Sequence, residues 1–240
     1  MIGALLPPLV PASLGGAIEF IFEPQNSSVT GGKQVGGLDQ VVELTLNQLE
    51  LTLLALAVSM VLALPLGLYL GHRGTGELLA IGLGNAGRAI PELGLIAFMA
   101  AAIGVGWRNV TIALAVLGIP PILTNAFVGI RQVDRAPVDA ARGMGMSELA
   151  ILLRVELPLA IPTVMAGIRG ATIAIVATAT IAPLAGVLTL GDFIINRNVY
   201  GPDGLLAGAI LVALLALVLE FSLAALQRAL TSKGLKVSTA

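Results

Sequence analysis

Long segments without a charged side chain are the feature that most restricts the fold of this chain. Residues 51–71, 109–130 and 170–191 each run for more than 20 residues without Asp, Glu, Lys or Arg, and residues 204–219 add 16 more. About 20 apolar helical residues cross the hydrocarbon core of a bilayer, which is ~30 Å thick. Hydrocarbon offers the backbone no hydrogen-bond partner, so such segments form helices, which satisfy their own N–H and C=O groups. The sequence therefore predicts an all-α membrane protein.

The composition excludes a soluble alternative. Hydrophobic residues make up 57% of the chain and charged residues only 11%, against roughly 45–50% and about 25% in soluble domains. A soluble chain of 240 residues has too small a core to bury that much apolar surface. Most soluble enzymes are therefore excluded, and the absence of cysteine also excludes disulfides and thiolate metal sites.

Two further segments decide how many spans we expect. Residues 77–107 are long enough to cross the membrane but are interrupted by charged residues and a proline. Counting them as a span, we expect a polytopic helical bundle of five core transmembrane helices. Residues 2–18 are apolar but contain three prolines, so we expect a short helix at or dipping into the membrane, with a sixth span as the alternative. Residues 23–40 are expected to form a polar loop.

Basic residues near the span ends predict the orientation. One set of loops carries only Lys33, Arg108 and Arg197. The opposite set carries eight: Arg73, Arg131, Arg135, Arg142, Arg154, Arg228, Lys233 and Lys236. Because cytoplasmic loops carry the excess of Lys and Arg, we expect the richer set and the C-terminus in the cytoplasm.

The loop at residues 131–158 carries two helix-capping signals. Asp134 is a good N-cap with Pro137 in the first turn that follows, and this helix should end near the glycines at 143–145. Ser147 then caps a second helix that runs to the end of the loop. This helix-turn-helix is either a docking surface for another protein or an amphipathic connector on lipid headgroups. Acidic residues interleave with its arginines, which argues against nucleic-acid binding.

The same loop carries a specific resemblance. Asp139-Ala-Ala-Arg-Gly, followed by Leu157-Pro158, resembles the EAA loop of ABC-importer permeases, whose pattern is an acidic residue, two alanines, a glycine and a later Leu-Pro. The longer run from Gly129 to Val155-Glu-Leu-Pro-Leu-Ala is similar to the branch that imports osmoprotectants such as glycine betaine, carnitine, choline and proline. The resemblance covers residues 46–228 and implies a methionine-permease-like fold.

The resemblance implies a transport subunit and not an enzyme. In this superfamily the EAA loop is the coupling helix that docks on a cassette ATPase dimer, so ATP and magnesium would be bound by that partner and no cofactor by this chain. The other implied partners are a second permease copy or paralogue, an extracytoplasmic substrate-binding protein and membrane lipid, in the plasma (inner) membrane of a bacterium. Carried over to this chain, the coupling positions are Asp139, Ala140, Ala141, Arg142, Gly143, Met144, Gly145 and Met146.

Arg88, Pro91 and Glu92 are the candidate residues of the translocation path. Arg88 and Glu92 are four apart, which places them on one face of a helix kinked at Pro91 and lets them neutralise each other. An intramembrane carboxylate can also meet a cationic substrate on its way through. Both roles stay open, and we favour the structural pair. Residues 82–87 spell GxGxxG, but they follow no strand, so no nucleotide site is expected.

Other side chains carry weaker signals. His72, the single histidine, lies beside Arg73 at a span end, and without partners a ligand role is not expected. Arg169, near the cytoplasmic end of the fourth predicted span, is expected to snorkel or pair locally. One tryptophan and two tyrosines are too few to predict an aromatic cage for a quaternary ammonium within the membrane, so substrate selection would rest with the binding protein.

The chain is accordingly expected to have three parts. Residues 1–40 form an N-terminal membrane-associated segment and external loop, residues 41–228 the permease domain, and residues 229–240 a cytoplasmic tail. The alternative functions are a permease for another small solute such as methionine, an ATPase-independent secondary transporter, and a structural protein or assembly factor. Secondary transporters commonly contain inverted repeats, and we find none in the sequence.

Overall fold

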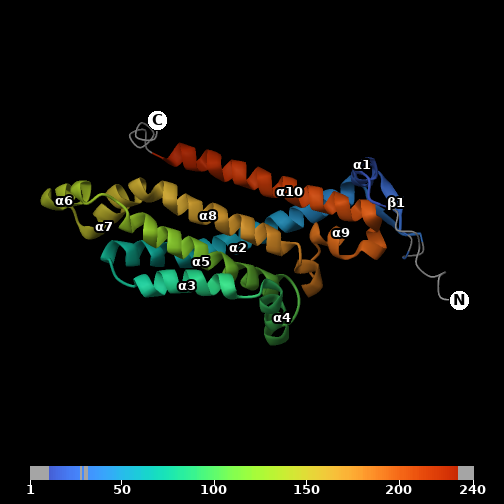
Figure 1. The fold of residues 1–240 in the computed structure, drawn as a ribbon, viewed down its shortest axis with the longest axis horizontal. Helices are drawn as coiled ribbons and strands as arrows, with labels where there is room; N and C mark the ends of the chain where they lie inside the picture. Colours follow the sequence, from blue (N-terminus) through green and yellow to red (C-terminus); the bar gives the residue numbers. More distant parts are fainter. Residues whose placement is uncertain (1–10, 28, 30–31, 232–240) are drawn as a thin grey trace.

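The computed structural model describes residues 11–27, 29 and 32–231, and most of them are helical. In chain order the elements are α1 (Leu14–Phe22), β1 (Pro24–Asn26), β2 (Gln34–Gly36), α2 (Gly37–Arg73), α3 (Glu77–Ala89), α4 (Glu92–Ile103), α5 (Trp107–Arg131), α6 (Arg135–Gly143), α7 (Glu148–Ile151), the π-helical turn η1 (Leu152–Glu156), α8 (Leu157–Ala179), the 3-10 helix η2 (Ala182–Ala185), α9 (Gly191–Ile195) and α10 (Arg197–Leu230). Figure 1 shows α6 and α7 at one end of the elongated molecule, with α1 and β1 at the other.

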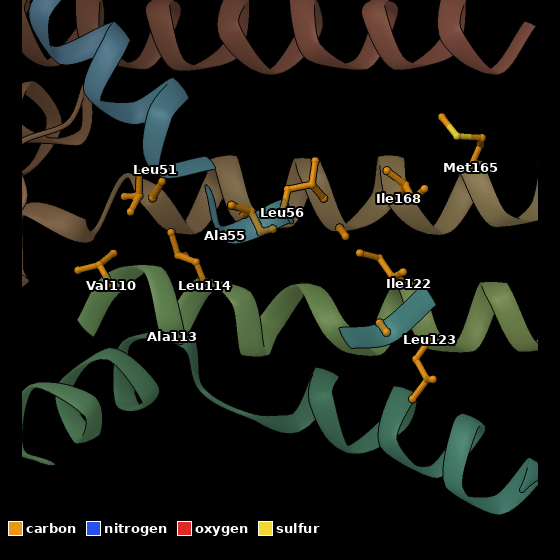
Figure 2. Close-up of a cluster of buried hydrophobic side chains, with 14 of the residues drawn as sticks. Leu51, Ala55, Leu56, Val110, Ala113, Leu114, Ile122, Leu123, Met165 and Ile168 are labelled. Atoms are coloured by element: carbon orange, nitrogen blue, oxygen red, sulfur yellow. The ribbon is translucent and has the colours of Figure 1, made fainter. Parts of the chain in front are cut away.

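The core lies where α2, α5 and α8 pack together. Leu51, Leu114 and Ile175 are fully buried, one from each helix, and Figure 2 shows side chains of this cluster between the helices. Gly67 lets α2 approach α5 closely, since a Cβ on it would lie 2.7 Å from the backbone oxygen of Leu123. Small residues play this part where helices pack in membranes. The predicted all-α membrane bundle is confirmed.

Within the described residues, four helices are long and apolar enough to cross a membrane: α2, α5, the continuous helix Glu148–Ala179 and α10. The predicted span at residues 77–107 is divided into α3 and α4, of 13 and 12 residues. The break falls at Ile90, whose backbone is extended because the residue before a proline disfavours the helical conformation. The number of five core transmembrane helices therefore stays a prediction.

The structure corrects the boundaries of another predicted span. The span expected at residues 170–191 lies instead at Glu148–Ala179, where α7, η1 and α8 form one continuous helix. Beyond it the chain turns back through η2, which contains Pro183 and is followed by Gly186 with a φ of +80°. The charge-free pattern does not include the first part of this helix, because Glu148, Arg154, Glu156 and Arg169 all lie within it.

The N-terminal elements cover one end of the bundle. α1 has nine residues and, at ~1.5 Å per residue, is too short to cross a bilayer. It packs against α10, and the Phe20 ring makes edge contacts with the rings of Phe193 in α9 and Tyr200 in α10. The predicted polar loop at residues 23–40 contains the antiparallel β1–β2 pair and the start of α2, so the loop is shorter than expected. Residues 1–10, which begin the predicted N-terminal segment, lie outside the described residues.

Candidate functional site

The segment between α5 and α8 folds as its two capping signals predict. The Asp134 carboxylate accepts a hydrogen bond from the Ala136 N–H at 3.1 Å, which starts α6. Ser147 Oγ accepts one from the Ala150 N–H at 3.3 Å, which starts α7. Between the helices the chain turns at Gly145, whose φ of +81° is left-handed and unstrained only for glycine. The helix-turn-helix is thus confirmed, and we call α6 and α7 together the α6–α7 hairpin.

A small core of its own holds the α6–α7 hairpin together. Val138, Ala141 and Ile151 are each at most 2% exposed and form one cluster, against which Met146 packs. Two of the predicted coupling residues, Ala141 and Met146, therefore face the interior of the hairpin. Because these contacts fix the two helices against each other, the outer side of the hairpin is a preformed surface.

The other predicted coupling residues lie on that outer side and are exposed: Asp139, Ala140, Arg142, Gly143, Met144 and Gly145. Met144 exposes 76% of its surface. A Cβ built on Gly143 would meet no atom within 4 Å, so the fold of this chain does not itself require glycine there. A small residue without an internal packing role, next to an exposed and adaptable methionine, is suited to the close approach of a partner.

Arg142 connects the two helices of the α6–α7 hairpin. Its Nε and Nη2 each donate to a carboxylate oxygen of Glu148 at 3.1 Å. Its Nη1 lies 3.4 Å from Asp139 Oδ1. The hydrogen bonds to Glu148 raise the pKa of Arg142 above its ordinary value. This bidentate geometry orients the guanidinium along the hairpin, so Arg142 braces α6 against α7.

Glu148 also connects the hairpin to the end of α2. His72, in the last turn of α2, has Nε2 3.2 Å from Glu148 Oε2 and Nδ1 2.6 Å from Glu156 Oε2. The side chains of His72 and Glu156 are only 9% and 3% exposed. The expectation that His72 has no partner is therefore wrong. No sequence signal marks this contact, because Glu156 lies 84 residues away from His72.

The three predicted pathway residues do not share one helix. Pro91 is the N-cap of α4 and Glu92 is its first residue, and both are exposed. Arg88 belongs to α3, and its side chain is outside the described part of the structure. The expectation that Arg88 and Glu92 lie on one helical face is wrong, because the helix ends before Pro91 instead of continuing through a kink. Their part in a translocation path stays a prediction.

The glycines of the GxGxxG sequence serve helix packing. Side chains at Gly84 and Gly87 would collide with Thr124 and Pro120 of α5, so these glycines let α3 lie close on α5. Gly82 has open space around it. In the part of the chain that the structure describes, no group of three His, Cys, Asp or Glu residues is arranged to hold a metal ion.

A family model described as the inner membrane component of binding-protein-dependent transport systems matches residues 63–232. The matched range begins within α2, contains the whole α6–α7 hairpin and extends to the end of α10. The chain belongs to this family. It is therefore the membrane permease component of an ABC importer, a family that works with an ATPase and a substrate-binding protein.

Two relatives and one solved structure show how far the likeness extends. The carnitine transport permease protein OpuCB of Listeria monocytogenes is 38% identical over 193 residues, which cover 80% of this chain and 88% of that protein. The glycine betaine/carnitine/choline transport system permease protein OpuCB of Bacillus subtilis is 36% identical over 79% of this chain and 88% of its own length. An inward-facing structure of the MetNI methionine ABC transporter matches 81% of this chain and 98% of the compared chain, with a TM-score of 0.69 and 21% identity. This last likeness concerns the fold, and it confirms the predicted methionine-permease-like architecture.

Proposed function

We propose that this permease imports osmoprotectants of the glycine betaine, carnitine, choline and proline class. The support comes from two relatives. The one that is 38% identical is named for carnitine transport. The one that is 36% identical is named for transport of glycine betaine, carnitine and choline. The likeness to the methionine transporter is one of fold at 21% identity and supports no substrate. Import of another small solute remains the alternative, and an uptake panel that includes methionine distinguishes the two.

The α6–α7 hairpin is the docking surface for the cassette ATPase in this proposal. The observation that carries it is a braced hairpin whose exposed turn contains Gly143, Met144 and Gly145. Packing within this chain does not require a residue as small as glycine at position 143. The buried cluster and the bond between Arg142 and Glu148 hold this surface in shape before any partner arrives. Preformed surfaces of this kind lose less conformational entropy on binding.

The membrane orientation follows from the same proposal. The hairpin and the C-terminal end of α10 lie toward one end of the molecule, while α1 and the β1–β2 pair lie at the other (Figure 1). The excess of basic residues on the hairpin side supports a cytoplasmic location for that end and for the tail at residues 229–240. Residues 1–40 would then lie on the outer side, where a binding protein delivers substrate to the permease domain at residues 41–228.

A second permease, identical or paralogous, completes the translocation path. The four long helices described here are too few to enclose a path alone. Large apolar side chains stay exposed on helices around the core, among them Leu78 of α3, Phe98 of α4 and Phe221 of α10. These faces suit lipid and a neighbouring permease. When ATP closes the ATPase dimer, the two docked hairpins move together and the bundles alternate between inward-facing and outward-facing states.

Replacing Gly143 by glutamate tests the docking surface. The open space at Gly143 accommodates the new side chain, so we expect normal membrane insertion and unfolding temperature. A charge forced into a tight interface without a partner is costly, so ATPase affinity should fall by roughly 100-fold and uptake should fall with it. The measurements are co-purification of the ATPase from detergent and ATP-driven uptake of betaines, proline and methionine in proteoliposomes.

The matched control is Ala136→Glu, which adds the same charge to the exposed first turn of α6. Acidic residues are favourable at a helix N-terminus, so this variant should retain the ATPase and transport activity. Normal ATPase binding by Gly143→Glu would contradict the docking assignment. Uptake of methionine in place of the osmoprotectants would contradict only the substrate class.

A further inference from the structure

The single histidine of the chain lies between two carboxylates that come from elements other than its own. Glu156 Oε2 approaches Nδ1 to 2.6 Å, and Glu148 Oε2 approaches Nε2 to 3.2 Å. Two charged groups touch the ring: Glu156 on η1 and Glu148 on α7. The other charged and titratable groups nearby are Arg142 on α6, which bonds to Glu148, Arg73 and Tyr69 on α2, and Arg131 of α5, which lies beside Gly74. The two oxygens that touch the ring are both carboxylate oxygens.

The donor and acceptor inventory decides which form of His72 fits this arrangement. An ionised carboxylate only accepts hydrogen bonds, and a neutral imidazole donates from one nitrogen while the other carries a lone pair. A neutral ring therefore satisfies one glutamate and sets its lone pair against the other. The imidazolium ion donates from both nitrogens and satisfies both. With both glutamates ionised, the hydrogen bonds at His72 are complete when the ring donates from both nitrogens.

Water and protons can reach this contact. A surface hollow of about 510 Å³ opens beside the imidazole, at the junction of α2 with the α6–α7 hairpin. Its lining consists of Tyr69, His72, Arg73, Glu148, Leu149 and Leu152. The contact therefore borders a hollow that solvent can enter.

The contact also joins parts of the chain that are distant in sequence. The hairpin is connected covalently to α5 on one side and, through η1, to α8 on the other. His72 adds a link to α2, which packs along α5 in the core. From the exposed turn the link runs through Asp139, Arg142 and Glu148 to the imidazole. A displacement of the hairpin can therefore reach α2 through these side chains.

We propose that His72 is a positioning residue that, in its charged form, clamps the α6–α7 hairpin to α2 and so transmits hairpin movement into the bundle. This inference rests on the proposed docking of the ATPase at the hairpin. Because only the charged ring donates to both glutamates, removal of its proton breaks one side of the link. The tightness of coupling, measured as solute imported per ATP hydrolysed, should therefore fall with rising pH.

The test compares wild type, His72→Lys and His72→Gln in proteoliposomes with the ATPase and the binding protein, from roughly pH 5.5 to pH 8. For wild type we expect the transport-to-hydrolysis ratio to fall by about three- to tenfold over this range, the effect of one charge-assisted hydrogen bond on an equilibrium. His72→Lys keeps a cation throughout and should give a high, flat profile. His72→Gln should give a low, flat profile. If His72 only supported the fold, the pH dependence of the wild type would persist in His72→Gln.

Two further variants complete the test. Glu156→Gln removes the more buried carboxylate at constant volume and should lower the ratio at acidic pH toward that of His72→Gln. Arg154→Gln, which changes an exposed charge on the same π-helical turn, should leave the wild-type profile intact. ATPase co-purification should be normal in all four variants, because none alters the exposed turn of the hairpin.

The outcomes separate this inference from the proposed function. A pH profile for His72→Gln that matches wild type would overturn the inference. So would loss of the ATPase from the His72→Gln complex alone, because the link would then hold the partner instead of transmitting its movement. An ATPase that fails to bind the wild-type permease, or that binds Gly143→Glu normally, would overturn the docking proposal instead.

Discussion

Two arginine–glutamate pairs of this permease have the same chemistry and contrasting surroundings. Arg142 and Glu148 join α6 to α7 on the outside of the hairpin, and their side chains are 50% and 58% exposed. Arg169 and Glu220 join α8 to α10, and their side chains are 30% and 24% exposed. Both α8 and α10 belong to helices long and apolar enough to cross the membrane. A membrane around these helices would therefore place lipid or another helix, in place of bulk water, around the second pair.

The surroundings decide what each pair contributes. Exposed pairs in water stabilise a protein by only ~0–1 kcal/mol, because each charge is well solvated without its partner. Within the membrane an isolated charge is costly, so each partner needs the other. Arg169 donates from Nε and Nη2 to Glu220 Oε1 and from Nη1 to Gln227 Oε1 at 2.8 Å. Glu220 Oε2 is buried and has no hydrogen-bond partner among the described residues, so Arg169 is the main compensation for this carboxylate.

Removing Arg169 is expected to have the largest effect. Arg169→Leu leaves the Glu220 carboxylate in the membrane without its cation, which should lower the free energy of unfolding by about 2–3 kcal/mol. The protein should also incorporate less completely into the membrane. The measurement is unfolding of the purified permease in lipid nanodiscs, followed by circular dichroism.

The matched control is the double variant Arg169→Leu with Glu220→Leu. Removing both charges together leaves no uncompensated ion, so most of the lost stability should return. If the double variant were as unstable as Arg169→Leu, the loss would come from packing between α8 and α10, and the contrast between the two pairs would not hold.

A cap should matter more to the hairpin than its ion pair does. Ser147→Ala removes the side chain that accepts from the Ala150 N–H at the start of α7, which should cost about 1 kcal/mol. The expected result is faster amide hydrogen exchange in α7 with no change in the global unfolding free energy. Ser222→Ala is the control, because Ser222 bonds to its own helix within α10 and caps nothing. Equal exchange rates in α7 of Ser147→Ala and wild type would contradict the cap assignment.

The hairpin could be predicted from sequence because its signals are local. Asp134 and Ser147 each bond to a backbone N–H two or three residues away, and Gly145 supplies a left-handed turn at a single position. The predicted coupling residues lie in a short contiguous pattern in the same segment, and their docking role stays a prediction. What sequence could not provide was the inward orientation of Ala141 and Met146, since this depends on how α6 lies against α7.

The errors arise where a distant partner changes the meaning of a residue. Arg169 ended the predicted charge-free span, yet it lies within a long helix because Glu220, 51 residues away, neutralises it. His72 seemed isolated in sequence because its two carboxylates belong to α7 and η1. At Pro91 the choice between a kink and a break depends on how α3 and α4 each pack on α5, and the local pattern allows both.

The smallest effect is expected at the exposed pair, and it completes the contrast. Arg142→Gln removes the bonds to Glu148, which should lower the local stability of the hairpin only slightly because both charges are solvated. Salt should reduce even this difference, since the screening length falls to ~3 Å at about 1 M ionic strength. The measurement is amide hydrogen exchange in α6 of Arg142→Gln at low and high salt. Exchange in α8 of Arg169→Leu is the comparison. A salt-independent loss comparable to that of Arg169→Leu would mean that the hairpin pair is shielded from water in the working protein. In that case the docked ATPase, and not the solvent, would set the environment of Arg142.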